Sequence, residues 1–169
     1  LNAAVFHVHS RFFTSVQALL KHKGIRLPLR VLSPDGGNMN VESSFANPAQ
    51  TILSGPSASV MGALAHAPKN KTCLVCDIGG TTTDMAIIYN GAPVIAPHGI
   101  EVGGLKTLVR SLLTRSIGIG GDSVVRVREK KIVIGPQRAG VAMALGGSRP
   151  TPTDAFCVLG QFGEGEREY

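Results

Sequence analysis

The sequence has no tryptophan and little aromatic character, with 2 tyrosines and 6 phenylalanines among 169 residues. The net charge is nevertheless +6, and basic residues gather between Lys106 and Arg149. A basic stretch could suit nucleic acid or a polyanionic nucleotide. Proteins that bind single-stranded nucleic acid also stack bases on aromatic side chains. Because such side chains are scarce, we expect no nucleic-acid partner and assign the basic residues to a solvated or subunit-facing surface.

Long apolar runs are also missing. The chain opens LNAAVFHVHSRFF, without an initiator methionine, without the basic and apolar regions of a signal peptide, and without a run long enough to span a bilayer. We expect a soluble, cytoplasmic protein with no membrane partner, cut from a longer chain. The length and the 43% hydrophobic content suit one domain over residues 1–169.

Cysteine is scarce, with Cys73 and Cys76 in a CxxC pair and Cys157 far along the chain. A zinc site needs more ligands and a turn that gathers them. Residues three apart on a strand point to opposite faces. We therefore expect Cys73 and Cys76 to be buried, reduced and free of metal, in a reducing compartment.

Hydrophobic periodicity and turn residues predict an α/β fold. Neither an internal repeat nor a low-complexity segment is found, and the acidic end, residues 163–169, is expected to fray. The predicted helices span residues 10–22, 54–67 and 103–115, with another starting at 151–154; the predicted strands span residues 27–32, 72–89 (a hairpin), 93–102, 124–129 and 131–135.

The stretch LVCDIGGTTTD, residues 74–84, carries the clearest chemistry. A glycine turn between two strands leaves backbone N–H groups free, and glycine has no Cβ to keep a phosphate away. The threonines add hydroxyl donors, whereas Asp77 and Asp84 need a cation such as Mg²⁺ beside a phosphate. The alternative is a plain hairpin whose threonines bond one another across the strands.

Other nucleotide motifs are absent. The sequence contains no G-x-x-x-x-G-K-[ST], and neither DIGGTTTD nor GIGGDS completes a G-x-G-x-x-G. DIGGTTTD instead resembles the phosphate loop of the actin-like ATPase and sugar-kinase superfamily, in which two lobes each offer such a hairpin to one nucleotide.

Within that superfamily, the chain resembles the A-type subunit of the hydantoinase and oxoprolinase family. The resemblance rests on SGPSASVMGA, DIGGTTTD, GIGGDS, GPQRAG and PTPTDA, which follow in the family's order. It implies a ribonuclease-H-like (actin-like ATPase) lobe with a mixed sheet, a phosphate-binding β-hairpin and flanking helices. It also implies ATP-dependent hydrolysis of a cyclic amide such as a hydantoin or 5-oxoproline, with related members carboxylating ketones.

The resemblance assigns roles to particular residues. Asp77 is the expected catalytic residue and organises Mg²⁺ through water; the other expected nucleotide-binding residues are Gly79, Gly80, Thr81, Thr82, Thr83, Asp84, Gly118, Gly120, Gly121 and Ser123. The expected cofactors are ATP and Mg²⁺. The expected partners are a cyclic amide, the remaining lobe of the parent protein and a B-type subunit, in an oligomer.

Two departures keep alternatives open. Asp122 stands where the family commonly has glycine, and no second DxGGT motif occurs in the chain. The chain therefore resembles one lobe, expected to be inactive alone, and an inactive nucleotide sensor or a ketone carboxylase subunit remains an alternative.

Three further positions are ambiguous. His98 lacks a spaced partner and is left out of the site. His7 and His9 alternate on a possible strand and are expected at the surface. The stretch 35–37 matches a family loop that faces the cleft, or is an ordinary turn.

Overall fold

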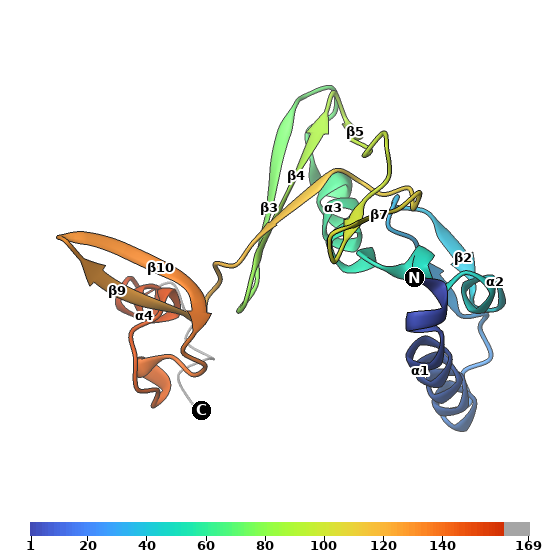
Figure 1. Ribbon diagram of the computed structural model, residues 1–169, viewed down its shortest axis with the longest axis horizontal. Helices are drawn as coiled ribbons and strands as arrows, with labels where there is room; N and C mark the ends of the chain where they lie inside the picture. The colour runs from blue at the N-terminus through green and yellow to red at the C-terminus, as the bar shows by residue number, and fades with distance from the viewer. Residues whose placement is uncertain (161–169) are drawn as a thin grey trace. The chain divides into compact units, whose positions relative to one another are not determined.

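The computed structural model describes residues 1–160 as helices and antiparallel sheets, a mixed α/β fold (Figure 1). The expected fraying of residues 163–169 lies outside the described residues. Two compact units are present: one comprises residues 1–75 and 86–114, and the second comprises residues 76–85 together with the chain from 115 onward. Strands β3 (Cys73–Ile78) and β4 (Thr83–Tyr89) pass through both units.

The first unit begins with helix α1 (Asn2–His22), which starts earlier than the sequence predicts. Nothing between Asn2 and Ser10 breaks a helix, and the Asn2 side chain accepts a hydrogen bond from the Ala49 N–H at 2.8 Å. The prediction of a possible strand around His7 and His9 is therefore wrong. The remaining early elements are β1 (Arg30–Leu32), β2 (Asn38–Asn40), α2 (Val41–Ala46) and the 3₁₀ turn η1 (Pro48–Thr51).

His9 is a core residue of this unit rather than a surface one, since only 8% of it is exposed. Its Nε2 lies 2.9 Å from the Ser44 hydroxyl on α2, and its ring packs on Phe13 with centroids 4.7 Å apart. Burial lowers the pKa of His9, so the neutral imidazole is favoured. The Ser44 hydroxyl donates to the Val41 carbonyl, which leaves the hydroxyl oxygen of Ser44 to accept a hydrogen bond from the Nε2–H of His9. This pair joins α1 to α2.

Helix α3 (Ser54–His66) occupies the position that the Ser-Gly-Pro start predicts and packs on the following strands. Its Val60 forms a core with Ala86 and Ile88 of β4 and with Leu112. The sheet has the order β3-β4-β5, with β8 also pairing with β4, where β5 is Ala92–Pro93 and β8 is Thr114–Ile117. Asn90 and Gly91 both have positive φ and turn the chain between β4 and β5.

The helix predicted for residues 103–115 is wrong. Gly103 and Gly104 have positive φ and form the turn between β6 (Glu101–Val102) and β7 (Leu105–Lys106). Further along, the Leu112 N–H donates to the Pro34 carbonyl and the Leu113 N–H donates to the Val94 carbonyl, each at 2.7 Å. These tertiary hydrogen bonds hold extended backbone and bury Leu112, so they override the helical spacing of the leucines.

The second unit contains the hairpin of β9 (Ser123–Arg128) and β10 (Lys131–Arg138), with helix α4 (Pro152–Val158) against β9 (Figure 1). The 3₁₀ turn η2 (Met143–Leu145) precedes α4. The predicted helix start is confirmed: the Thr151 and Asp154 side chains form a capping box. Burial raises the pKa of Asp154, but hydrogen bonds from the Ala144 N–H and from Thr151 outweigh it, so the pKa is lowered.

All three cysteines are free thiols. Cys73 is half-buried, as its place beside the core requires, but Cys76 is exposed, so the expectation that both are buried is wrong. The core covers only the start of β3, and Cys76 lies beyond it. Within residues 1–160, no helix combines the length and the apolar character that crossing a bilayer requires.

Candidate phosphate-binding site

The predicted hairpin at the centre of the site is confirmed. Strands β3 and β4 flank a short turn, closed by a hydrogen bond of 2.9 Å from the Gly79 N–H to the Thr82 carbonyl. We refer to residues 79–82 as the hairpin turn. Gly79, Gly80 and Thr81 are exposed at this turn.

A second glycine segment, residues 118–123, packs directly on the hairpin turn; we call it the glycine loop. The Gly121 N–H donates to the Gly79 carbonyl at 2.9 Å, and the Asp122 N–H donates to the Gly80 carbonyl at 2.7 Å. A Cβ on Gly120 would lie 2.5 Å from the Gly79 oxygen. Glycine at 120 is therefore required for contact between the two segments.

The side chains of Thr83 and Ser123 are used inside this unit. The Thr83 hydroxyl donates to the Ile119 carbonyl at 2.7 Å, and the Ser123 hydroxyl accepts from the Gly120 N–H at 2.9 Å. Both residues are buried. The sequence predicts that Thr83 adds a hydroxyl for phosphate and that Ser123 approaches the nucleotide; in this structure their side chains fix the glycine loop to the hairpin and to itself.

The arrangement differs from a plain hairpin with threonines bonded across its strands. Thr83 bonds to the glycine loop, and Thr81 makes no hydrogen bond to any other part of residues 1–160. In a trans peptide, a carbonyl and the N–H of the next residue point in opposite directions. Since the carbonyls of Gly79 and Gly80 face the glycine loop, the N–H groups of Gly80 and Thr81 point away from it.

Helix α4 supports the glycine loop from its N-terminal end. The N–H and hydroxyl of Thr153 both donate to the Gly121 carbonyl, at 3.2 and 2.9 Å. A Cβ on Gly121 would lie 2.8 Å from the Thr153 hydroxyl oxygen. The close approaches of Gly120 and Gly121 are thus made to the protein itself.

The carboxylates expected at the site occupy different environments. Asp77 is exposed near the end of β3, and Asp84 is half-buried on β4. Asp122 forms an ion pair with Arg138, with 2.6 Å between Oδ2 and the guanidinium nitrogen. Across residues 1–160, no group of three or more His, Cys, Asp or Glu side chains could hold a metal. Gly118 is exposed, and a Cβ there would lie 3.2 Å from Pro136.

The stretch 35–37 in the first unit has the geometry of an ordinary turn. One Asp35 carboxylate oxygen accepts from the Ser33 hydroxyl at 2.5 Å and from the Gly37 N–H at 3.1 Å. The Ser33 hydrogen bond is the main cause that lowers the pKa of Asp35, with further contributions from the Gly37 N–H and from Arg110. The carboxylate is committed to its own turn.

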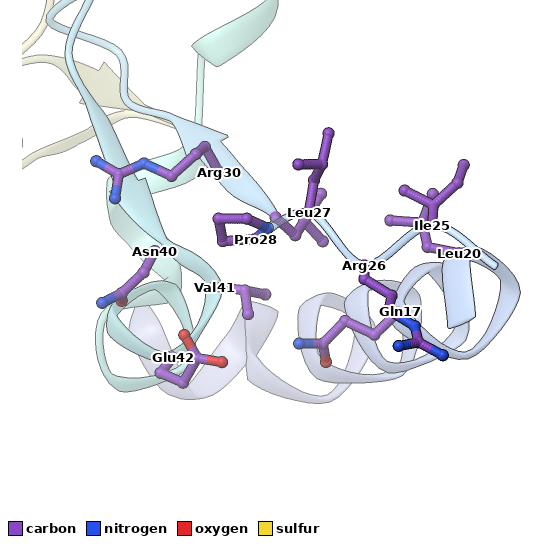
Figure 2. Close-up of a pocket in the computed structure, with 11 residues that line it drawn as sticks. Gln17, Leu20, Ile25, Arg26, Leu27, Pro28, Arg30, Asn40, Val41 and Glu42 are labelled. Atoms are coloured by element: carbon purple, nitrogen blue, oxygen red, sulfur yellow. The ribbon is translucent and has the colours of Figure 1, made fainter.

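A separate pocket of about 280 Å³ lies between the end of α1, residues 25–30 and the start of α2 (Figure 2). Figure 2 shows the side chains of Arg26 and Arg30 extending in different directions. Arg30 is held by a hydrogen bond of 2.8 Å to the Asn38 side chain. Because its cations do not converge, this pocket is a weaker candidate for an anion than the hairpin turn.

Neither Thr153 nor Arg138 is among the site residues predicted from the sequence. Thr153 lies in the motif PTPTDA and Arg138 in the motif GPQRAG, both of which support the family resemblance. The motifs are a signal that could have identified these residues. Their contacts could not be predicted locally, because Arg138 bonds to Asp122 16 residues away and Thr153 bonds to Gly121 32 residues away.

Comparison with known proteins places these features in a family context. The family model described as hydantoinase/oxoprolinase matches residues 1–166. The gamma subunit of acetophenone carboxylase from Aromatoleum aromaticum is 32% identical over 158 residues, which cover 83% of this chain and 20% of that protein. An uncharacterised protein of Methanocaldococcus jannaschii is 29% identical, over 97% of this chain and 27% of its own length.

A solved structure of nucleotide-free acetone carboxylase, from work on the mechanism of ATP-dependent acetone carboxylation, is similar with a TM-score of 0.69 and 28% identity. The match covers 89% of this chain and 22% of that one. The chain thus spans about a fifth to a quarter of the length of these relatives.

Proposed function

Because the chain belongs to the hydantoinase/oxoprolinase family, we propose that it is a nucleotide-binding lobe of an ATP-dependent enzyme of that family. In this proposal, residues 1–169 form one ribonuclease-H-like lobe of a longer protein. The remaining lobe closes over the nucleotide, and a B-type subunit completes an oligomeric enzyme. The relative described as a gamma subunit supports an assembly of several chains.

The observation that carries the proposal is the orientation of the hairpin turn. The glycine loop takes up the carbonyls of Gly79 and Gly80, which turns the N–H groups of Gly80 and Thr81 to the opposite side. Backbone N–H groups aligned in this way form an anion site that needs no side-chain charge. Exposed Gly80 and Thr81 therefore suit the phosphates of ATP, and the Thr81 hydroxyl adds a further donor.

The carboxylates near the turn suit a magnesium ion held mainly by the nucleotide. Mg²⁺ beside a nucleotide keeps several waters and takes one or two carboxylates. A dedicated cage of three side chains is not needed, which agrees with the lack of one within residues 1–160. Exposed Asp77 would hold the hydrated ion, and ATP would supply the phosphoryl group that activates a carbonyl oxygen.

Two reactions follow from activation of a carbonyl oxygen. In the first, the oxygen belongs to a cyclic amide such as a hydantoin or 5-oxoproline, and water opens the ring. In the second, it belongs to a ketone that is then carboxylated. Two proteins that resemble this chain, acetophenone carboxylase and acetone carboxylase, favour the second reaction as strongly as the family description favours the first.

ATP hydrolysis by the full-length protein with its partner subunits tests this proposal. We expect ADP formation to rise at least tenfold above the substrate-free rate, with either 5-oxoproline or hydantoin, or with acetone or acetophenone plus bicarbonate. Stimulation by the amides alone identifies a hydrolase, and stimulation that needs both ketone and bicarbonate identifies a carboxylase. ATP binding without stimulation by either set contradicts the enzyme proposal in favour of a nucleotide sensor.

A further inference from the structure

Asp122 and Arg138 form an ion pair beside the hairpin turn. The Asp122 Oδ2 atom lies 2.6 Å from the Arg138 guanidinium nitrogen, and the same oxygen would lie 2.9 Å from a Cβ on Gly80. The carboxylate therefore contacts the turn directly. Arg138 is connected to the hairpin turn through its hydrogen bond to this carboxylate.

An acid at this position conflicts with the binding of phosphate. Asp122 would repel a phosphate at the N–H groups of Gly80 and Thr81, and Asp77 already contributes negative charge nearby. A guanidinium paired with Asp122 removes most of this repulsion. It also has several N–H donors in a planar fork, and the ion pair uses one nitrogen.

The backbone fixes both partners of the ion pair. The Asp122 N–H donates to the Gly80 carbonyl, and the Asp122 backbone carbonyl accepts from the Ala139 N–H, each at 2.7 Å. Arg138 ends β10 and lies opposite Ser123 of β9. Arg138 is thus held near the hairpin turn by strand β10 and by the hydrogen bond from the next residue, Ala139, to Asp122. Its side chain is 53% exposed.

Arg126 on β9 uses its guanidinium for hydrogen bonds within the β9–β10 hairpin. It donates to the Gly135 carbonyl at 3.1 Å and to the Gln137 side-chain oxygen. Arg128 ends β9, next to the turn that joins it to β10 and opposite Lys131. Arg138 is therefore the arginine of this hairpin that combines exposure with an ion pair to Asp122, the residue whose carboxylate contacts the hairpin turn.

We propose that Arg138 binds the phosphates of the nucleotide, with Asp122 as the positioning residue that aims its guanidinium. This inference rests on the proposed function, because it takes ATP as the ligand of the hairpin turn. The ligand class is a nucleoside polyphosphate, and the contact is to its phosphates rather than its base or ribose.

Calorimetric titration of the full-length protein with Mg-ATP, and separately with adenosine, tests this proposal. For Arg138→Gln we expect the Kd for Mg-ATP to rise roughly 10- to 100-fold, the loss of a charge-assisted contact, with adenosine binding unchanged. Arg128→Gln is the matched control, since it removes the same charge from the same hairpin. Its Kd values should stay within about twofold of wild type.

Asp122→Asn separates positioning from charge. If Asp122 aims Arg138, this variant weakens Mg-ATP binding several-fold even though a negative charge is removed. If the acid only repels phosphate, the variant binds Mg-ATP more tightly, which overturns the positioning role.

The outcomes for Arg138 and for the lobe are distinguishable. If wild type binds Mg-ATP but Arg138→Gln binds it within twofold, the role of Arg138 is wrong and the proposed function stands. Equal losses for Mg-ATP and adenosine, or a lowered melting temperature of Arg138→Gln, also overturn the phosphate contact. Failure of wild type to bind Mg-ATP overturns both proposals.

Discussion

Replacing Asp77 with asparagine in the full-length protein should lower ATP-dependent turnover by on the order of 10²-fold or more, with little change in stability. Asp77 is the fifth residue of β3 and lies two residues before the glycine turn. Alternate residues of a strand share a face, so Asp77 lies on the same face of β3 as Cys73 and Val75. Those two residues pack against the core, and Asp77 lies beyond it. Asparagine keeps the size of the side chain and its ability to hydrogen-bond but removes the charge that, in the proposed function, balances Mg²⁺.

The matched control for this variant is Asp84→Asn. Asp84 is half-buried on β4, after the turn rather than before it, and should tolerate the change better. Steady-state ADP release and a thermal melt of each variant check the expectation. Turnover of Asp77→Asn within a few-fold of wild type, or lost only through unfolding, would make this carboxylate structural and favour the sensor function.

Gly120→Ala should disrupt the site through the backbone. Its new Cβ would lie 2.5 Å from the Gly79 oxygen and 2.6 Å from the carbonyl carbon and oxygen of Gly80. No flexible side chain can move aside, so the glycine loop and the hairpin turn must separate. We expect a loss of about 1–3 kcal/mol in unfolding free energy and at least a tenfold weaker affinity for Mg-ATP.

Gly62→Ala provides the comparison for this substitution. Gly62 lies inside α3, and apart from its chain neighbours and the backbone of its own helix no atom lies within 4 Å of the Cβ that alanine would add. The same chemical change should there be neutral or stabilise the protein by about 0.5–1 kcal/mol. Chemical denaturation and calorimetry of both variants measure the two effects. Wild-type stability and affinity in Gly120→Ala would show that the two loops are not in the described contact.

Local sequence signals predicted the elements that carry the site. The apolar runs beside Gly79 and Gly80 specified the hairpin, alternation specified β9 and β10, and Thr151 to Asp154 specified the start of α4. Each of these signals acts within a few residues. The family resemblance, now supported by the match over residues 1–166, added the expectation of ATP.

The errors arose where distant contacts decide the structure. The leucines between 105 and 113 have helical spacing, but hydrogen bonds to Pro34 and Val94 hold the chain extended there. His9 lacks any local sign of burial, because its partner Ser44 lies 35 residues away. Thr83 belongs to a polar motif, and only the fold shows that its hydroxyl faces Ile119.

The central claim is that the hairpin turn binds the phosphates of ATP. A structure of the full-length protein with Mg²⁺ and a non-hydrolysable ATP analogue tests it most directly. We predict phosphate oxygens within about 2.7–3.2 Å of the N–H groups of Gly80 and Thr81, and a hydrated Mg²⁺ beside Asp77. An analogue whose phosphates lie away from residues 79–82, with the turn bonded only to protein, would contradict the account.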